Sequence, residues 1–60
     1  MTTYEFIYQV IAADGPCSRA HIEWDCAQQG FTEGMDEALA DMERDGVIRT
    51  EDSGAYIELV

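Results

Sequence analysis

The sequence contains no lysine, and three arginines are set against thirteen acidic residues, for a formal net charge of −10. Proteins that bind DNA or RNA normally carry a basic stripe for the phosphates, and none is visible here. A charge of this sign repels nucleic acids and anionic membranes and attracts basic partners. Many acids with scarce lysine also suit a protein adapted to high salt, where the charge is a solubility device.

Other residues and segments are scarce as well. Two cysteines are too few for a disulfide framework. The first ten residues, MTTYEFIYQV, are too short and acidic to resemble a signal peptide. No apolar run approaches the roughly 18 residues that a membrane helix needs. We therefore expect a cytoplasmic protein.

Few residues are available for catalysis or metal binding. With one histidine, no glycine-rich phosphate loop and too little chain for an enclosed pocket, the sequence does not indicate an enzyme. Cys17, His21 and Cys26 offer three metal ligands, but the spacing C-x3-H-x4-C matches no standard zinc pattern. His21 and Cys26 also point to different helix faces. We expect a buried Cys26 thiol, a surface His21 imidazole, and neither metal nor cofactor.

The residues that are present predict one folded domain over residues 1–60. An apolar content of 47% with 10% aromatic residues is ample for a globular fold and argues against disorder. A chain of this length buries only about 60% of its unfolded surface, so the core is small.

The first helix is predicted over Thr2–Ala13. Thr2-x-x-Glu5 fits a capping box, in which the threonine and the glutamate each bond to the other's backbone. An apolar stripe with helical spacing follows at Phe6, Ile7, Val10 and Ile11. The sequence Asp14-Gly15-Pro16 ends the helix, and Pro16-Cys17 is predicted to be a short extended connector.

The second helix is predicted over Arg19–Gln29, with Ser18 as N-cap and Gly30 as its end. Ile22 and Cys26 share its apolar face, and Trp24 falls nearly opposite. Two placements of Trp24 remain open. It is buried if this helix is covered on two sides, and it is an outward anchor for a protein interface if it is not.

The stretch Thr32–Val47 organises the chain and contains the third helix, with Thr32 as a predicted cap and Gly46 as its end. Phe31 is predicted to plug the core at the preceding turn. Leu39 is predicted to sit between all three helices. The apolar face has the spacing of one helix side and consists of Met35, Ala38, Leu39 and Met42.

Two strands are predicted at the end of the chain, Val47–Glu51 and Ala55–Val60, joined by a hairpin turn at 52–54. The inward residues are Ile48, Ile57 and Leu59, and the outward residues are Arg49, Glu51 and Glu58. The expected fold class is therefore α+β, with three helices and a C-terminal two-stranded β-hairpin.

The order helix, short extended link, helix, turn, helix, hairpin resembles a winged helix-turn-helix domain, with the hairpin as wing. The resemblance covers nearly the whole chain. Its motifs are Gly15-Pro16-x-Ser18-Arg19, Ala38-Leu39-x-x-Met42-x-x-x-Gly46-x-Ile48 and Tyr56-x-x-Leu59.

That resemblance implies DNA binding by the third helix in the major groove. By position, the residues facing the groove would be Glu33, Asp36, Glu37, Ala40, Asp41 and Arg44. Four of these are acids, which cannot approach a phosphate backbone without basic neighbours. The sequence therefore departs from the family pattern where the family touches DNA, and the resemblance supports the architecture rather than the usual activity.

The acidic third helix has two interpretations, a solvated face or a surface that imitates nucleic-acid phosphates. Acids on one helix face stand about 5–6 Å apart, of the order of phosphate spacing along a strand. In size and acidity the chain resembles the small DNA-mimic inhibitors of phages, anti-CRISPR proteins among them. This resemblance predicts an inhibitor that occupies the nucleic-acid site of a basic partner. Such an inhibitor would act in the host cytoplasm if a phage encodes it. The predicted partner-binding residues are Trp24, Glu33, Asp36, Glu37, Asp41 and Arg44.

Two alternatives stay open. One is a winged-helix transcription regulator that binds DNA, as a dimer or from a salt-adapted organism. It would need the arginines at positions 19, 44 and 49 to converge into a basic patch. The other is an interaction module within a larger assembly.

Overall fold

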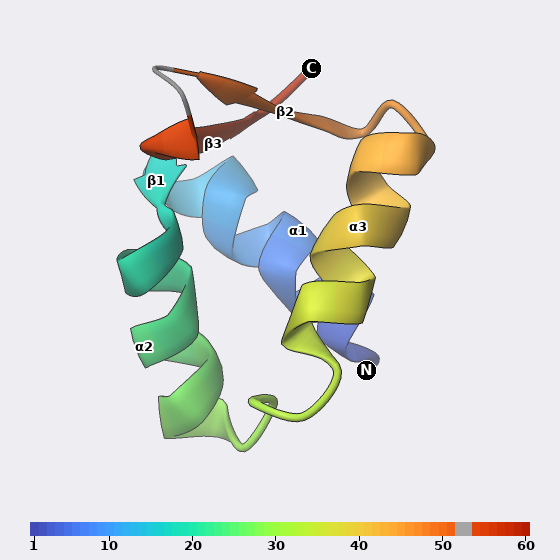
Figure 1. Ribbon diagram of the computed structural model, residues 1–60. Helices are drawn as coiled ribbons and strands as arrows, with labels where there is room; N and C mark the ends of the chain where they lie inside the picture. Colours follow the sequence, from blue (N-terminus) through green and yellow to red (C-terminus); the bar gives the residue numbers. More distant parts are fainter. Residues whose placement is uncertain (52–53) are drawn as a thin grey trace.

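The computed structural model describes residues 1–51 and 54–60, so Asp52 and Ser53 of the predicted hairpin turn lie outside the described residues. Three helices and a three-stranded antiparallel sheet confirm the α+β class (Figure 1). The elements in chain order are α1 (Thr3–Asp14), β1 (Cys17–Ser18), α2 (Arg19–Gln29), α3 (Met35–Arg44), β2 (Ile48–Glu51) and β3 (Tyr56–Leu59).

Helix α1 occupies the centre and contacts α2, α3 and β3. Its predicted capping box is confirmed, because the Glu5 N–H donates to the Thr2 hydroxyl at 3.1 Å and the Thr2 N–H donates to the Glu5 carboxylate at 2.9 Å. Ile7 and Ile11 face the core and are 0% and 2% exposed. The helix ends at Gly15, whose φ of 77° lies in the region that favours glycine.

Helix α2 has the predicted bounds. The Ser18 side chain accepts from the His21 N–H at 3.1 Å, and left-handed Gly30 ends the helix. Ile22 and Cys26 are both fully buried, as predicted. Trp24 is 63% exposed, which excludes the buried placement. The helix covered by two others is α1 rather than α2, so α2 buries one face and the opposite face is left to solvent.

Helix α3 begins at Met35, later than predicted. Its N-cap is left-handed Gly34, with a φ of 83° and no side-chain capping bond, so the prediction of Thr32 as cap is wrong. The chain needs Gly34 to turn before the helix, and this leaves Thr32 outside the first turn. At the other end Gly46 is left-handed, as predicted, with a φ of 75°. The Val47 N–H donates to the Met42 carbonyl at 3.0 Å, which closes the turn.

The sheet has three strands in the order β1-β3-β2, so the prediction of a two-stranded hairpin missed one strand. Strands β2 and β3 pair antiparallel, with Ile48 opposite Leu59. The predicted extended connector forms a third strand, since Cys17 pairs with Ile57 on the other side of β3. An edge strand leaves backbone donors and acceptors unpaired, and β1 satisfies part of that edge.

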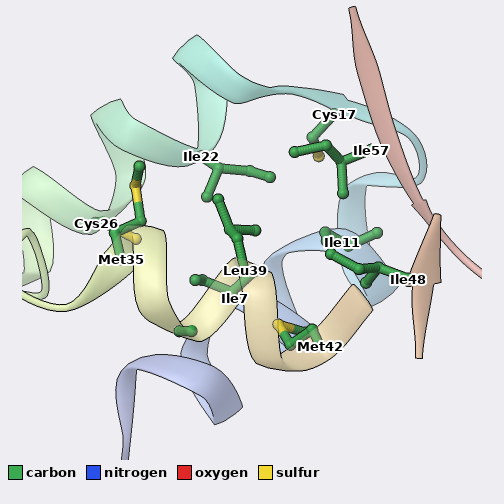
Figure 2. Close-up of a cluster of buried hydrophobic side chains, with 11 residues drawn as sticks. Ile7, Ile11, Cys17, Ile22, Cys26, Met35, Leu39, Met42, Ile48 and Ile57 are labelled. Atoms are coloured by element: carbon green, nitrogen blue, oxygen red, sulfur yellow. The ribbon is translucent and has the colours of Figure 1, made fainter. Parts of the chain in front are cut away.

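All three helices and the sheet contribute to one core (Figure 2). Leu39 is 5% exposed and points into this cluster from α3. Phe31 is half-buried and stacks on Phe6 with ring centroids 5.0 Å apart, so it covers the core rather than filling it. The buried residues are Ile7, Ile11, Cys17, Ile22, Cys26, Met35, Ala38, Leu39, Met42, Ile48 and Ile57.

The substitution Leu39→Ala should cost on the order of 2–5 kcal/mol, because it leaves a cavity in the core of a small domain. A thermal melt followed by circular dichroism measures the loss. Glu37→Ala is the matched control, since it truncates an exposed side chain of the same helix and should melt close to the wild type. Equal melting of Leu39→Ala and the control would contradict the placement of Leu39.

Candidate functional site

Most of the predicted partner-binding residues lie on the side of α3 that faces away from the core, or in the loop before it. Asp36, Glu37 and Arg44 are exposed, Asp41 is partly exposed, and Glu33 is exposed in the loop. The structure adds Glu43, an exposed acid of α3 that we did not predict as a site residue. Its place seven residues after Asp36 could have indicated it. We define the acidic face as Glu33, Asp36, Glu37, Asp41 and Glu43.

The one arginine of α3 is held by neighbouring acids. Arg44 Nη1 lies 3.3 Å from Asp41 Oδ1, and Nη2 lies 3.4 Å from Asp45 Oδ1. Asp45 also accepts a hydrogen bond at 3.1 Å from the Tyr4 hydroxyl of α1. Partial burial, with this hydrogen bond to Asp45, raises the pKa of Tyr4. The positive charge at the end of α3 is therefore shared between two carboxylates.

The other two arginines are paired in the same way. Arg19 contacts Asp36 of α3 and lies 3.7 Å from Glu23 of its own helix. Arg49 Nε lies 2.7 Å from Glu58 on the facing strand and 3.0 Å from Glu51, which places these three predicted outward residues together. Among the residues that the structure describes, the three arginines share no acidic partner, so they form three separate clusters rather than a basic patch.

Three acids of the acidic face remain without a counter-charge. Within residues 1–51 and 54–60, Glu33, Glu37 and Glu43 form no ion pair. All three are exposed. Each arginine is therefore paired with acids, and the outward side of α3 remains negative. A negative surface favours a cationic ligand over an anionic one.

A groove between α2 and α3 adjoins the acidic face. Its lining consists of Glu23, Ala27, Thr32, Gly34, Met35, Asp36 and Glu37. Trp24 lies on α2 next to Glu23 but is not part of the lining. The structure therefore brings acids of both helices together at the groove and leaves Trp24 as a separate exposed ring.

A second cluster of polar groups lies where α1, β1 and α2 meet. Among the described residues, the set Cys17, His21 and Cys26, for which we expected no metal, does not come together as a group of ligands, because Cys26 is not part of the cluster. Asp14, which we did not predict, joins Cys17 and His21 instead, and ligand atoms of the three lie within 4.8 Å of one another. The spacing Asp14-x2-Cys17-x3-His21 was the signal in the sequence that could have indicated it.

Two carboxylates approach the histidine ring, one from α1 and one from α2. His21 Nε2 lies 3.1 Å from Asp14 Oδ2 and 3.2 Å from Asp25 Oδ2. The Cys17 thiol donates to the Gly15 carbonyl at 3.1 Å. Burial, followed by the charges of Asp14 and Asp25, raises the pKa of Cys17. The cluster thus holds its sulfur as a neutral thiol beside two carboxylates.

Comparisons of the chain with protein-family models, with curated proteins and with solved structures give no match. In the part of the chain that the structure describes, no helix is long and apolar enough to cross a membrane. What the acidic face does must therefore follow from its own exposure, charge and contacts.

Duplex DNA should not bind this protein detectably at physiological salt, because the described arginines are paired and the outward side of α3 is negative. An electrophoretic mobility shift assay over a range of salt concentrations tests this. A shift with nanomolar affinity at physiological salt would favour the transcription regulator. A complex that forms only at very high salt would favour a salt-adapted version of that regulator.

Proposed function

We propose that residues 1–60 form a winged helix-turn-helix domain that works through protein contact. The order α1, β1, α2, α3, β2, β3 supports this, because it follows the helix, extended link, helix, turn, helix and hairpin of that family. The added pairing of β1 with β3 keeps the hairpin and extends its sheet. In this arrangement α3 takes the place of the helix that would read DNA.

The function proposed is inhibition of a basic nucleic-acid-binding protein or complex, by occupying the site that holds its nucleic acid. The protein would then act as a DNA mimic, as small phage inhibitors of the anti-CRISPR kind do. One observation carries this proposal. The arginines are paired with acids, while Glu33, Glu37 and Glu43 have no counter-charge among the described residues.

The chemistry of the acidic face suits such a partner. A carboxylate accepts charge-assisted hydrogen bonds from arginine and lysine, as a phosphate does. Acids three and four residues apart on a helix stand about 5–6 Å apart, so successive carboxylates can meet successive basic side chains. A concentrated negative field also speeds the encounter with a positive groove.

Two predicted partner-binding residues take supporting roles in this proposal. Arg44 contacts Asp41 and Asp45, and would hold these carboxylates in place at the end of α3. Trp24 offers an exposed ring of the type that anchors protein interfaces, on α2 and outside the lining of the groove. The acids would guide the partner and the indole would supply apolar contact.

No observation of comparable weight favours the alternative function, a transcription regulator that binds DNA. A regulator would need available bases on α3 and on the hairpin. Arg44 and Arg49 are the arginines at those places, and each is held by two carboxylates.

Neutralising the acids that lack a counter-charge tests the mimic directly. The triple variant is Glu33→Gln, Glu37→Gln and Glu43→Gln. It removes three charges, breaks no described ion pair and nearly keeps side-chain shape, so stability should change little. Affinity for the partner should fall on the order of 10-fold or more. The measurement is capture from a bacterial extract on immobilised protein, followed by titration of the basic proteins retained.

The control removes the same charge elsewhere, from α1 and from the sheet, where it also breaks the two ion pairs of Arg49. It consists of Glu5→Gln, Glu51→Gln and Glu58→Gln. Glutamine at position 5 keeps the capping box. This control should bind the partner as the wild type does. Added duplex DNA should displace the partner from the wild type and from the control. Retained proteins that respond neither to the triple variant nor to competing DNA would overturn the proposed function.

A further inference from the structure

We propose that Asp14, Cys17, His21 and Asp25 form a zinc-binding site at the junction of α1, β1 and α2, separate from the acidic face. Ligand atoms of Asp14, Cys17 and His21 lie within 4.8 Å of one another. Asp25 is the fourth proposed ligand. It is not one of the three residues of that group, but its Oδ2 lies 3.2 Å from the same His21 nitrogen that Asp14 Oδ2 approaches at 3.1 Å. A thiolate, an imidazole and carboxylates are all ligands that zinc accepts.

Local structure brings these four residues together. Asp14 is the last residue of α1, and the turn at Gly15 redirects the chain into β1, where Cys17 pairs with Ile57. Ser18 then caps α2 and places His21 in its first turn. Asp25 follows four residues later, so it shares a helix face with His21.

The resulting spacing is D-x2-C-x3-H-x3-D. Zinc sites commonly use two ligands separated by two residues, and also two ligands four residues apart on one helix. Both spacings occur here in a single short segment. The pattern escapes a search for cysteines and histidines alone, because carboxylates provide half of the ligands.

The distances fit a tetrahedral ion. Zinc bonds to nitrogen and oxygen of about 2.0–2.2 Å place neighbouring N and O ligands about 3.3–3.5 Å apart. The two observed N–O distances, 3.1 and 3.2 Å, are slightly shorter. A zinc–sulfur bond of about 2.3 Å needs sulfur about 3.5–3.7 Å from the other ligands. Small side-chain rotations from the 4.8 Å cluster would reach that arrangement.

Charge and access also suit a cation. Without an ion the Cys17 thiol donates a hydrogen bond to the Gly15 carbonyl. On binding, sulfur would bond to the metal and the thiol proton would pass to solvent, while the histidine binds as neutral imidazole. The Asp14 and His21 side chains are 50% and 46% exposed, which gives an ion a path to the buried sulfur.

Such an ion would join the end of α1 to the start of α2. A chain with a small core gains much from a structural metal, because binding to the folded state adds to the free energy of folding.

The test uses the reduced, metal-free protein with Co²⁺ and then Zn²⁺ as probes. Co²⁺ should give tetrahedral d–d absorption and a thiolate charge-transfer band, and Zn²⁺ should bleach both. Zn²⁺ should also raise the melting temperature. Loss of an outer-shell partner alone costs about 10–100-fold in metal affinity. The ligand variants Cys17→Ser, His21→Gln and Asp14→Asn should therefore lose more than about 100-fold.

Cys26→Ser is the matched control, because it removes the other buried thiol and should keep both bands. His21→Gln and Asp14→Asn change exposed residues, so they test the site even if Cys17→Ser fails to fold. Absence of a thiolate band with excess Co²⁺ would overturn the proposal. A band that survives Cys17→Ser but disappears in Cys26→Ser would overturn it equally.

Discussion

The buried face of α1 is the contact on which the rest of the structure depends. Ile7 and Ile11 are almost fully buried, and their helix contacts α2, α3 and β3. Because so short a chain has one small core, α2 and α3 both pack their apolar faces against α1. Their opposite faces are left to solvent. The central place of α1 therefore explains why Trp24 and the acids of α3 are exposed at the surface.

Charge on α3 follows the helix dipole. Asp36 and Glu37 lie in the first turn, where negative charge is favourable, and Arg44 lies in the last, where positive charge is favourable. Gly34 provides no side-chain cap, so the acids also compensate for a weak start. The helix thus tolerates like charges that would otherwise repel one another. Pairing of Arg44 with Asp41 and Asp45 completes the arrangement, and no base of α3 is left unpaired in the described part of the chain.

Local hydrogen bonding explains what the sequence predicted well. The capping box at Thr2 and the bounds of α2 depend on neighbouring residues, and both are confirmed. Where distant contacts decide, the sequence left the outcome open or gave it in part. Pairing of β1 with β3 joins residues about forty positions apart, and exposure of Trp24 depends on which helix is central. The approach of Asp14 to His21 depends on the turn at Gly15 as well as on the spacing of the two residues in the sequence.

Under the proposed function, the acidic face contributes during encounter with a basic partner, so the association rate is the most direct measure of the account. Stopped-flow mixing of the protein with a captured basic partner, at increasing salt, separates association from dissociation. The account predicts that the association rate falls steeply with salt while the dissociation rate changes little, because salt screens charges that are still apart. An association rate that stays constant with salt would contradict it.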